Sequence, residues 1–113
     1  FLIYTSAPSG RDDESRFRIR VDAIEAVDHA LPAVLTIEPD VIAVTGDYSA
    51  PIGLPGPSWH AVPFLLWSPY CRFNRVERFT ELECANGMLG RLHSTNAMSL
   101  MLANALKLKP LGD

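Results

Sequence analysis

The sequence predicts an α/β fold built on a mainly parallel sheet of about three short strands with flanking helices. Continuous apolar runs occupy residues 1–4, 41–44 and 64–67, and such runs are typical of strands covered on both faces. Apolar residues at helical spacing follow the first run and the last. The order strand, helix, strand, strand, helix indicates one domain at most, and its open sheet edges favour a piece of something larger.

Each predicted strand is bounded by residues that interrupt regular structure. Residues 1–4 precede a turn with Pro and Gly, and residues 41–44 end at Thr45-Gly46-Asp47. The segment 48–58 contains three prolines and two glycines, so it is predicted to be a loop. Pro63 stands just before the third run, where a missing N–H does least harm to strand pairing.

The first amphipathic helix is predicted over residues 14–31. Acidic residues stand at its start, where the helix dipole favours negative charge, and Pro32 is expected to disturb its end. Its apolar spacing follows one helical face. That face consists of Phe17, Val21, Ile24, Val27 and Leu31.

A last helix is predicted over residues 96–107, after a short helix between Glu77 and Cys84. We expect Ser94 or Thr95 to cap its start, because a hydroxyl accepts a hydrogen bond from the first free N–H groups. Pro110 and Gly112 are expected to stop it. Its predicted inner face consists of Met98, Met101, Leu102, Ala105 and Leu106.

The composition argues against several classes of protein. A net charge of −3 and a pI near 5.5 disfavour a nucleic-acid binder, which needs a basic face. No apolar run approaches the ~18 residues of a membrane span, and residues 1–4 lack the basic flank of a signal peptide. The chain begins with Phe, so we expect upstream residues in the gene product. Cys71 and Cys84 have no CxxC partner, which favours a reduced, cytoplasmic protein.

Several segments, taken in order, carry a resemblance to a known family. Residues 41–51, VIAVTGDYSAP, are similar to a strand and loop with the motif VTGDHSTP, and residues 57–68, PSWHAVPFLLWS, resemble the family's HSWHPVPVLLWS. Residues 23–28 and 87–105 match the preceding helix and the closing stretch. The chain thus resembles the C-terminal part of archaeal-type, 2,3-bisphosphoglycerate-independent phosphoglycerate mutases of the alkaline phosphatase superfamily.

This resemblance implies a fragment of the alkaline-phosphatase-like three-layer fold, with residues 1–113 as a single partial domain matching the C-terminal metal-binding half. The family interconverts 3-phosphoglycerate and 2-phosphoglycerate through a phosphorylated serine, using two Mn or Mg ions. Metals suit this reaction because a phosphate monoester is surrounded by negative charge that must be neutralised. The serine belongs to the N-terminal portion, so we expect no catalytic residue and no cofactor in this chain alone.

The resemblance also implies that most metal ligands have been replaced. Asp47 is retained, but Tyr48 and Pro57 stand where the family has histidines, and Ser9 and Asp13 stand where it has an Asp and a His. Asp47 is therefore a candidate vestigial metal ligand, and Asp13 is a candidate oxygen substitute. The alternative for Asp47 is a structural role, accepting hydrogen bonds from backbone N–H groups of the loop.

Other polar residues have both a structural and a functional interpretation. His60 is expected to make local hydrogen bonds in a loop, and His29 is expected near a helix end, where a cation suits the dipole. Arg91 and His93 together are a candidate anion contact, because Arg binds phosphate well. The aromatic residues of the loops predict either core packing or a protein-binding patch. They are Tyr48, Trp59, Trp67, Tyr70 and Phe73.

Two functional hypotheses follow. The first is a degenerate, non-catalytic phosphoglycerate-mutase-like protein that serves as an accessory subunit and is covered by another protein chain or a second copy. The second is a segment of a metal-dependent phosphoglycerate mutase whose catalytic serine lies on a missing N-terminal part. Tyr48 and Pro57 favour the first, because no upstream segment restores ligands at those positions. An unrelated binding module is a third alternative, disfavoured by the length of the match.

Overall fold

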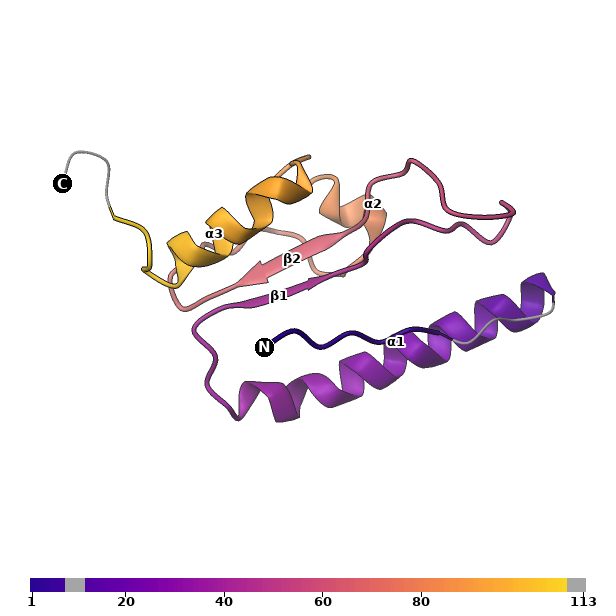
Figure 1. Ribbon diagram of the computed structural model, residues 1–113, viewed down its shortest axis with the longest axis horizontal. Helices are drawn as coiled ribbons and strands as arrows, with labels where there is room; N and C mark the ends of the chain where they lie inside the picture. The colour runs from indigo at the N-terminus through magenta and orange to yellow at the C-terminus, as the bar shows by residue number, and fades with distance from the viewer. Residues whose placement is uncertain (8–11, 110–113) are drawn as a thin grey trace. The chain divides into compact units, whose positions relative to one another are not determined.

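The computed structural model describes residues 1–7 and 12–109. Helices and strands follow one another as in an α/β protein, which confirms the predicted class. The chain divides into two compact units, Phe1–Pro39 with Ala50–Ser58 and Asp40–Ser49 with Trp59–Asp113. In order, the elements are α1 (Asp13–Leu35), β1 (Ile42–Thr45), β2 (Phe64–Trp67), α2 (Glu81–Cys84), the 3-10 turn η1 (Ser94–Asn96) and α3 (Ala97–Asn104) (Figure 1).

The first unit is dominated by α1, a helix of 23 residues. It begins at a capping box, in which Asp12 Oδ1 accepts from the Ser15 N–H at 2.8 Å and Ser15 Oγ accepts from the Asp12 N–H at 3.2 Å. The helix runs beyond the predicted end at residue 31. Pro32 removes only its own N–H, and the Thr36 N–H still closes the last turn on the Pro32 carbonyl at 3.3 Å.

The two strands pair antiparallel, so the predicted parallel sheet is wrong for this pair. Ile42 faces Trp67 and Thr45 faces Phe64, and Thr45 Oγ1 donates to the carbonyl of Pro63 at 2.8 Å. A parallel partner requires a crossover, usually through a helix, whereas no helix lies between β1 and β2 in this described stretch. A direct return of the chain therefore places the second strand antiparallel to the first.

The predicted strand over residues 1–4 does not form. Residues 1–7 have no regular secondary structure, and the side chains of Phe1 and Leu2 are fully or almost fully exposed. Within the described residues the sheet has two strands only, neither of which pairs with this segment. A strand needs a neighbour to bond its backbone N–H and C=O groups, and apolar composition alone does not supply one.

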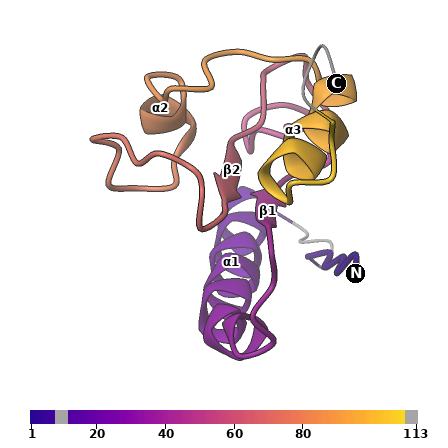
Figure 2. The same cartoon turned by 90° about the vertical axis from the view of Figure 1, so that its left-hand side faces the viewer.

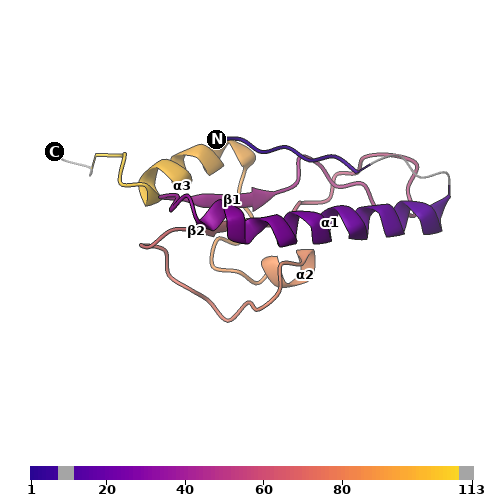
Figure 3. The same cartoon turned by 90° about the horizontal axis from the view of Figure 1, so that it is seen from below.

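In the second unit, α2 and α3 lie on opposite sides of the two-stranded sheet (Figure 2 and Figure 3). The hydroxyl of Ser68, a residue only 2% exposed, connects the end of β2 to α3. Ser68 Oγ donates to Asn104 Oδ1 at 2.9 Å and accepts from the N–H groups of Tyr70 and Cys71 at 3.1 and 3.0 Å. One donor and two acceptor sites are all that a hydroxyl has, so this group is fully used.

The short helices differ from the prediction at their ends. The predicted helix between Glu77 and Cys84 is limited to α2, because Thr80 caps it and the Glu83 carboxylate accepts from the N–H groups of Glu77 and Arg78 at 3.1 and 2.9 Å. That carboxylate thus bonds two N–H groups that lie before the helix.

The last helix is shorter than the predicted range 96–107. No side-chain cap forms at Ser94 or Thr95; the 3-10 turn η1 leads into α3 instead. The helix stops because Leu106 adopts a left-handed conformation with φ of 57°, and the Lys107 N–H bonds to the Leu102 carbonyl at 2.8 Å. The predicted stops at Pro110 and Gly112 lie outside the described residues.

No hydrophobic side chain is fully buried among residues 1–7 and 12–109. On the predicted inner face of α1, Phe17 is 59% exposed and Ile24 is 68% exposed. On α3, Met98 is 62% exposed. The apolar periodicities that predicted these helices are therefore present, but their faces remain largely open to solvent.

We predict that acid weakens the start of α1 through Asp12. The hydrogen bond from the Ser15 backbone N–H, aided by the Ser15 hydroxyl, lowers the pKa of the Asp12 carboxyl below its ordinary value of 3.8. The stabilisation by the charged cap is thus complete above pH 3.8 and is lost as the pH falls through the lowered pKa. Asp12→Asn keeps a good cap without a charge. Far-UV circular dichroism should therefore show that the helicity of this variant differs from that of the wild type only at pH values above the lowered pKa of Asp12. A difference that persists unchanged at lower pH would contradict the assignment.

We predict that Ser68→Ala destabilises the second unit by about 1–3 kcal/mol, because it removes three part-buried hydrogen bonds, to the Asn104 side chain and from the N–H groups of Tyr70 and Cys71. Urea unfolding monitored by circular dichroism measures the change. Ser99→Ala, at an exposed position of α3, is the matched control and should change stability by less than about 0.5 kcal/mol. Equal effects of the two substitutions would show that the Ser68 hydroxyl is not a structural link.

Candidate functional site

The first candidate residue, Asp47, follows β1 directly, as the sequence predicts. Its Oδ1 accepts from the backbone N–H of Tyr48 at 3.0 Å, and its side chain is exposed. This contact matches the structural alternative, in which the carboxylate supports the loop.

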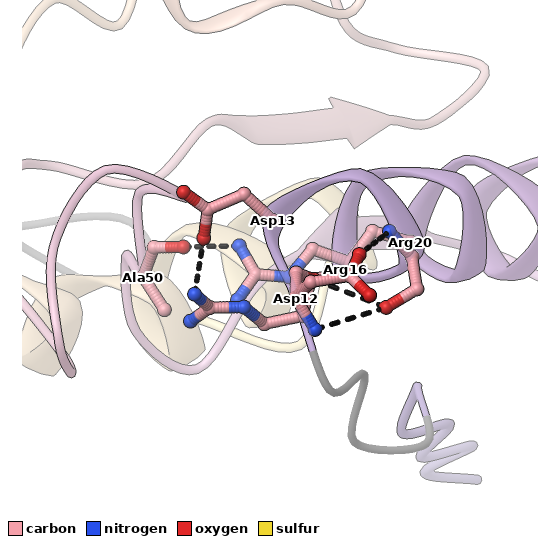
Figure 4. A network of polar contacts seen from close by, with 6 residues as sticks. Asp12, Asp13, Arg16, Arg20 and Ala50 are labelled. Atoms are coloured by element: carbon pink, nitrogen blue, oxygen red, sulfur yellow. Dashed lines mark hydrogen bonds and ion pairs between the residues drawn. The ribbon is translucent and has the colours of Figure 1, made fainter.

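The second candidate, Asp13, occupies the first turn of α1 (Figure 4). Its Oδ1 forms an ion pair and hydrogen bond with Nη2 of Arg16, one turn along the helix. Arg20 in the same unit donates through Nη1 to the carbonyl of Ala50. Asp13 therefore has a cationic partner within its own helix, and a metal at this carboxylate would compete with Arg16.

The side chains in hand do not fit the two-metal centre that the resemblance implies. Hard divalent cations take six or more oxygen ligands or a set of oxygen and imidazole ligands. Pro57 has no donor atom, Tyr48 offers a phenol that is 57% exposed, and Ser9 lies outside the described residues. Within residues 1–7 and 12–109, no three His, Cys, Asp or Glu side chains gather closely enough to hold an ion. We therefore derive no catalytic step through a metal.

The histidines occupy different settings from one another. His60 stacks on Trp59, with ring centroids 5.1 Å apart and planes inclined by 19°. His29 lies well inside α1 and not near its end, since the helix continues to Leu35. The predicted favourable position of a cation at the helix end is therefore wrong for His29. His93 immediately precedes η1, whose first turn closes on its carbonyl through the Asn96 N–H at 2.9 Å.

Arg91 and His93, the candidate anion contact, line a surface hollow of about 360 Å3 together with Trp59, Ala61 and Leu92. Both lining segments belong to the second unit: residues 59–61 lead into β2, and residues 91–93 lead into η1. The sequence placed Arg91 beside His93 but did not associate either with Trp59. No spacing in the sequence signals that contact, because the two segments come together only through the fold.

The loop aromatics are surface residues in the structure. Trp59 is 87% exposed and Phe73 is 94% exposed, so the interpretation as core packing is wrong for these two side chains. Cys71 and Cys84 form no disulfide. Cys71 is engaged locally, with Sγ donating to the Ser68 carbonyl at 3.2 Å. None of the helices within the described ranges combines the length and the apolar character needed to cross a bilayer.

Comparison with known proteins agrees with the motifs. Residues 14–104 match the Metalloenzyme superfamily. Over 112 residues, the chain is 39% identical to a relative from Thermotoga maritima, 42% identical to one from Aquifex aeolicus and 40% identical to one from Thermus thermophilus. Each bears the name "Probable 2,3-bisphosphoglycerate-independent phosphoglycerate mutase".

The aligned region covers very different shares of this chain and of its relatives. It includes 99% of this chain but only 28% of each of these three relatives. No solved structure is significantly similar to the chain. The family match covers most of the sequence and agrees with the strand-and-loop motif at residues 41–51. The chain therefore belongs to the Metalloenzyme superfamily, and it spans 28% of the length of these relatives named as phosphoglycerate mutases.

Proposed function

We propose that this chain is the C-terminal metal-site segment of a phosphoglycerate mutase that interconverts 3-phosphoglycerate and 2-phosphoglycerate. The identity of about 40% to proteins of that name, sustained over 112 residues, carries the proposal. The retained loop Thr45-Gly46-Asp47 at the end of β1 supports it, because strand ends are where such sites collect their ligands. On this proposal residues 1–113 are one partial domain, and the nucleophilic serine lies on polypeptide outside it.

A Mn or Mg ion would supply neutralisation of the phosphoryl charge in such an enzyme. This chain would contribute the Asp47 carboxylate, already oriented by the Tyr48 N–H, and the Asp13 carboxylate, for which a metal would compete with Arg16. The free thiols of Cys71 and Cys84 agree with a reduced, cytoplasmic setting.

A second candidate is a non-catalytic, accessory role for the same fold. Tyr48 and Pro57 favour it, because they replace imidazole ligands of the related motif with a phenol and with a side chain that has no donor atom. Metal affinity falls steeply when even supporting residues of a site are lost, by about 10- to 100-fold. The two candidates agree on ancestry and fold and differ only in whether turnover survives.

Both candidates include a protein partner. Met98 and Leu102 on α3, and residues 1–4, expose apolar side chains in the described structure. Contiguous apolar surface is uncommon on soluble monomers and usually lies in an interface. We propose that another polypeptide, either the remainder of a mutase or a second copy, covers one of these surfaces.

We predict that the 113-residue chain alone has no phosphoglycerate mutase or phosphatase activity in the presence of Mn²⁺. The resemblance assigns the nucleophile to the portion outside these residues, and one retained carboxylate cannot organise a two-metal reaction. A coupled assay that converts 2-phosphoglycerate onward measures turnover. Activity of the purified chain that disappears in Asp47→Ala would overturn this prediction.

We predict that a chimera separates the two candidates. Residues 1–113 replace the matching 28% of the Thermotoga maritima relative, which leaves the remaining polypeptide to supply the serine. Turnover by the chimera within about tenfold of its parent would support the mutase segment, since lost ligands cost at least about 10- to 100-fold.

Back-substitution makes the chimera decisive. If the loss of ligands has inactivated this segment, the chimera shows no turnover. The double substitution Tyr48→His with Pro57→His should then raise the turnover rate of the chimera at least about tenfold and make it depend on Mn²⁺. Tyr48→Phe is the matched control, because it removes the phenol without adding a ligand, and it should restore nothing. Circular dichroism confirms that each chimera is folded. A folded chimera that stays inactive after back-substitution would exclude both the intact segment and ligand loss as its explanation.

A further inference from the structure

The apolar stripe of α1 is largely open to solvent. None of the 23 residues of this helix is buried. Along the stripe, Ile24 is 68% exposed and Phe17 is 59% exposed, whereas Val21, Val27 and Leu31 are half-buried. Helices in proteins draw most of their stability from the packing of an apolar face. A partner on this stripe would therefore bury apolar surface that α1 leaves in water.

The spacing of the stripe is the same in both directions along the helix. From Phe17 to Leu31 the apolar residues follow at intervals of four, three, three and four, with Ile24 at the centre. A second α1 turned end for end about Ile24 therefore presents the same stripe. Phe17 of one copy then lies opposite Leu31 of the other, and Ile24 lies opposite itself. Val21 and Val27 face one another across the two copies in the same way. Such a contact is self-complementary, as a two-fold dimer requires.

Charges beside the stripe favour this antiparallel direction. Arg18, Glu25 and Asp28 follow one another at intervals of seven and three, so they lie on one flank of the helix. In an antiparallel pair centred on Ile24, Arg18 of each copy lies within one turn of Asp28 of the other copy on that flank. In a parallel pair each of the three charged residues would lie beside its own counterpart, which brings like charges together. Flanking charges set the orientation of paired helices in this manner.

The charges on this flank are available for a contact between copies. Among the described residues, neither Glu25 nor Asp28 takes part in an ion pair. The pair of Arg18 with Glu14 is loose, with Nη2 and Oε1 3.9 Å apart and side chains that are 76% and 88% exposed. An exposed pair of this kind contributes little, so Arg18 can exchange Glu14 for a carboxylate of a second copy.

From the spacing and the charges we propose that α1 pairs antiparallel with α1 of a second copy of this chain. Ile24 lies on the two-fold axis, and Arg18 of each copy lies beside Asp28 of the other. This surface is distinct from residues 1–4 and from α3. The inference therefore goes beyond the proposed function and does not depend on turnover.

Sedimentation equilibrium of the 113-residue chain tests the pairing. We expect a monomer–dimer equilibrium with a dissociation constant on the order of 10 µM, because a single pair of helices makes a small interface. Ile24→Lys should raise this constant at least about tenfold, since two like charges then replace two apolar side chains on the axis. Leu82→Lys is the matched control, because Leu82 on α2 is 79% exposed and lies outside the stripe, and it should leave the constant unchanged. Circular dichroism confirms that each variant is folded.

A charge reversal tests the direction of the pairing and leaves the stripe intact. Arg18→Glu alone and Asp28→Arg alone should each weaken the dimer by about two- to fivefold, because each brings like charges together twice in every dimer. The double variant restores opposite charges between the copies, so its dissociation constant should return to within about twofold of the wild type. The double variant still lacks the pair of Arg18 with Glu14, so recovery identifies a contact between copies and not an effect within one helix.

Distinct results would overturn the proposal. A chain that stays monomeric up to about 1 mM, a hundred times the expected constant, would show that no second copy covers the stripe. Dimerisation that persists in folded Ile24→Lys but is lost in Met98→Lys would assign the interface to α3. Single charge reversals without effect, or a double variant that does not recover, would exclude the antiparallel arrangement centred on Ile24.

Discussion

The second unit depends on the buried hydroxyl of Ser68. This one group bonds α3 through Asn104 and closes the turn after β2 through the N–H groups of Tyr70 and Cys71. Asn104 in turn donates to the Leu100 carbonyl at 2.9 Å, which ties the link to the body of the helix. Since no hydrophobic side chain in the described ranges is fully buried, directional hydrogen bonds of this kind carry a larger share of the specificity than in an ordinary domain. Residues 59–61 and 91–93, which line the hollow, are connected through the same sheet and helix.

The sheet shows both the strength and the limit of sequence analysis. The apolar runs located β1 and β2 to within one residue, because short continuous apolar runs bounded by turn residues are typical of strands. The apolar runs did not determine whether the two strands pair parallel or antiparallel. Ile42, Val44, Leu65 and Trp67 share one face of the antiparallel pair, and Trp67 on it is 42% exposed. Apolar residues on both faces of a strand predict a parallel sheet, whereas here they belong to an antiparallel pair whose faces are only partly covered. Residues 1–4 illustrate the same limit, since their composition is that of a strand and no described strand pairs with them.

In the candidate site, too, contacts between residues adjacent in sequence could be predicted, and contacts between distant segments could not. Asp47 could be placed at a strand end because strand and loop are adjacent in sequence, and the structure puts it there. The neighbourhood of Arg91 and His93 could be predicted from their adjacency, but their meeting with Trp59, some thirty residues earlier, is a property of the fold. The two ends of α3 differ from the prediction because of local backbone hydrogen bonds. The 3-10 turn before α3 and the left-handed Leu106 after it depend on backbone bonds that compete with side-chain caps, and residue types alone do not decide that competition.

The framework of the second unit is physically separable from the positions at which the related motif places metal ligands. The bonds that hold the strand pair and α3, from Thr45 to Pro63 and from Ser68 to Asn104, involve none of the positions at which the related motif places metal ligands. These bonds do not involve the side chains of Tyr48 or Pro57. The carboxylate of Asp47 fits this separation because its bond to the Tyr48 N–H gives it a structural use that does not require a metal. Asp47 thus has a structural use beside any use as a ligand. The proposal of a mutase segment therefore depends on the identity of about 40% over 112 residues rather than on this one carboxylate.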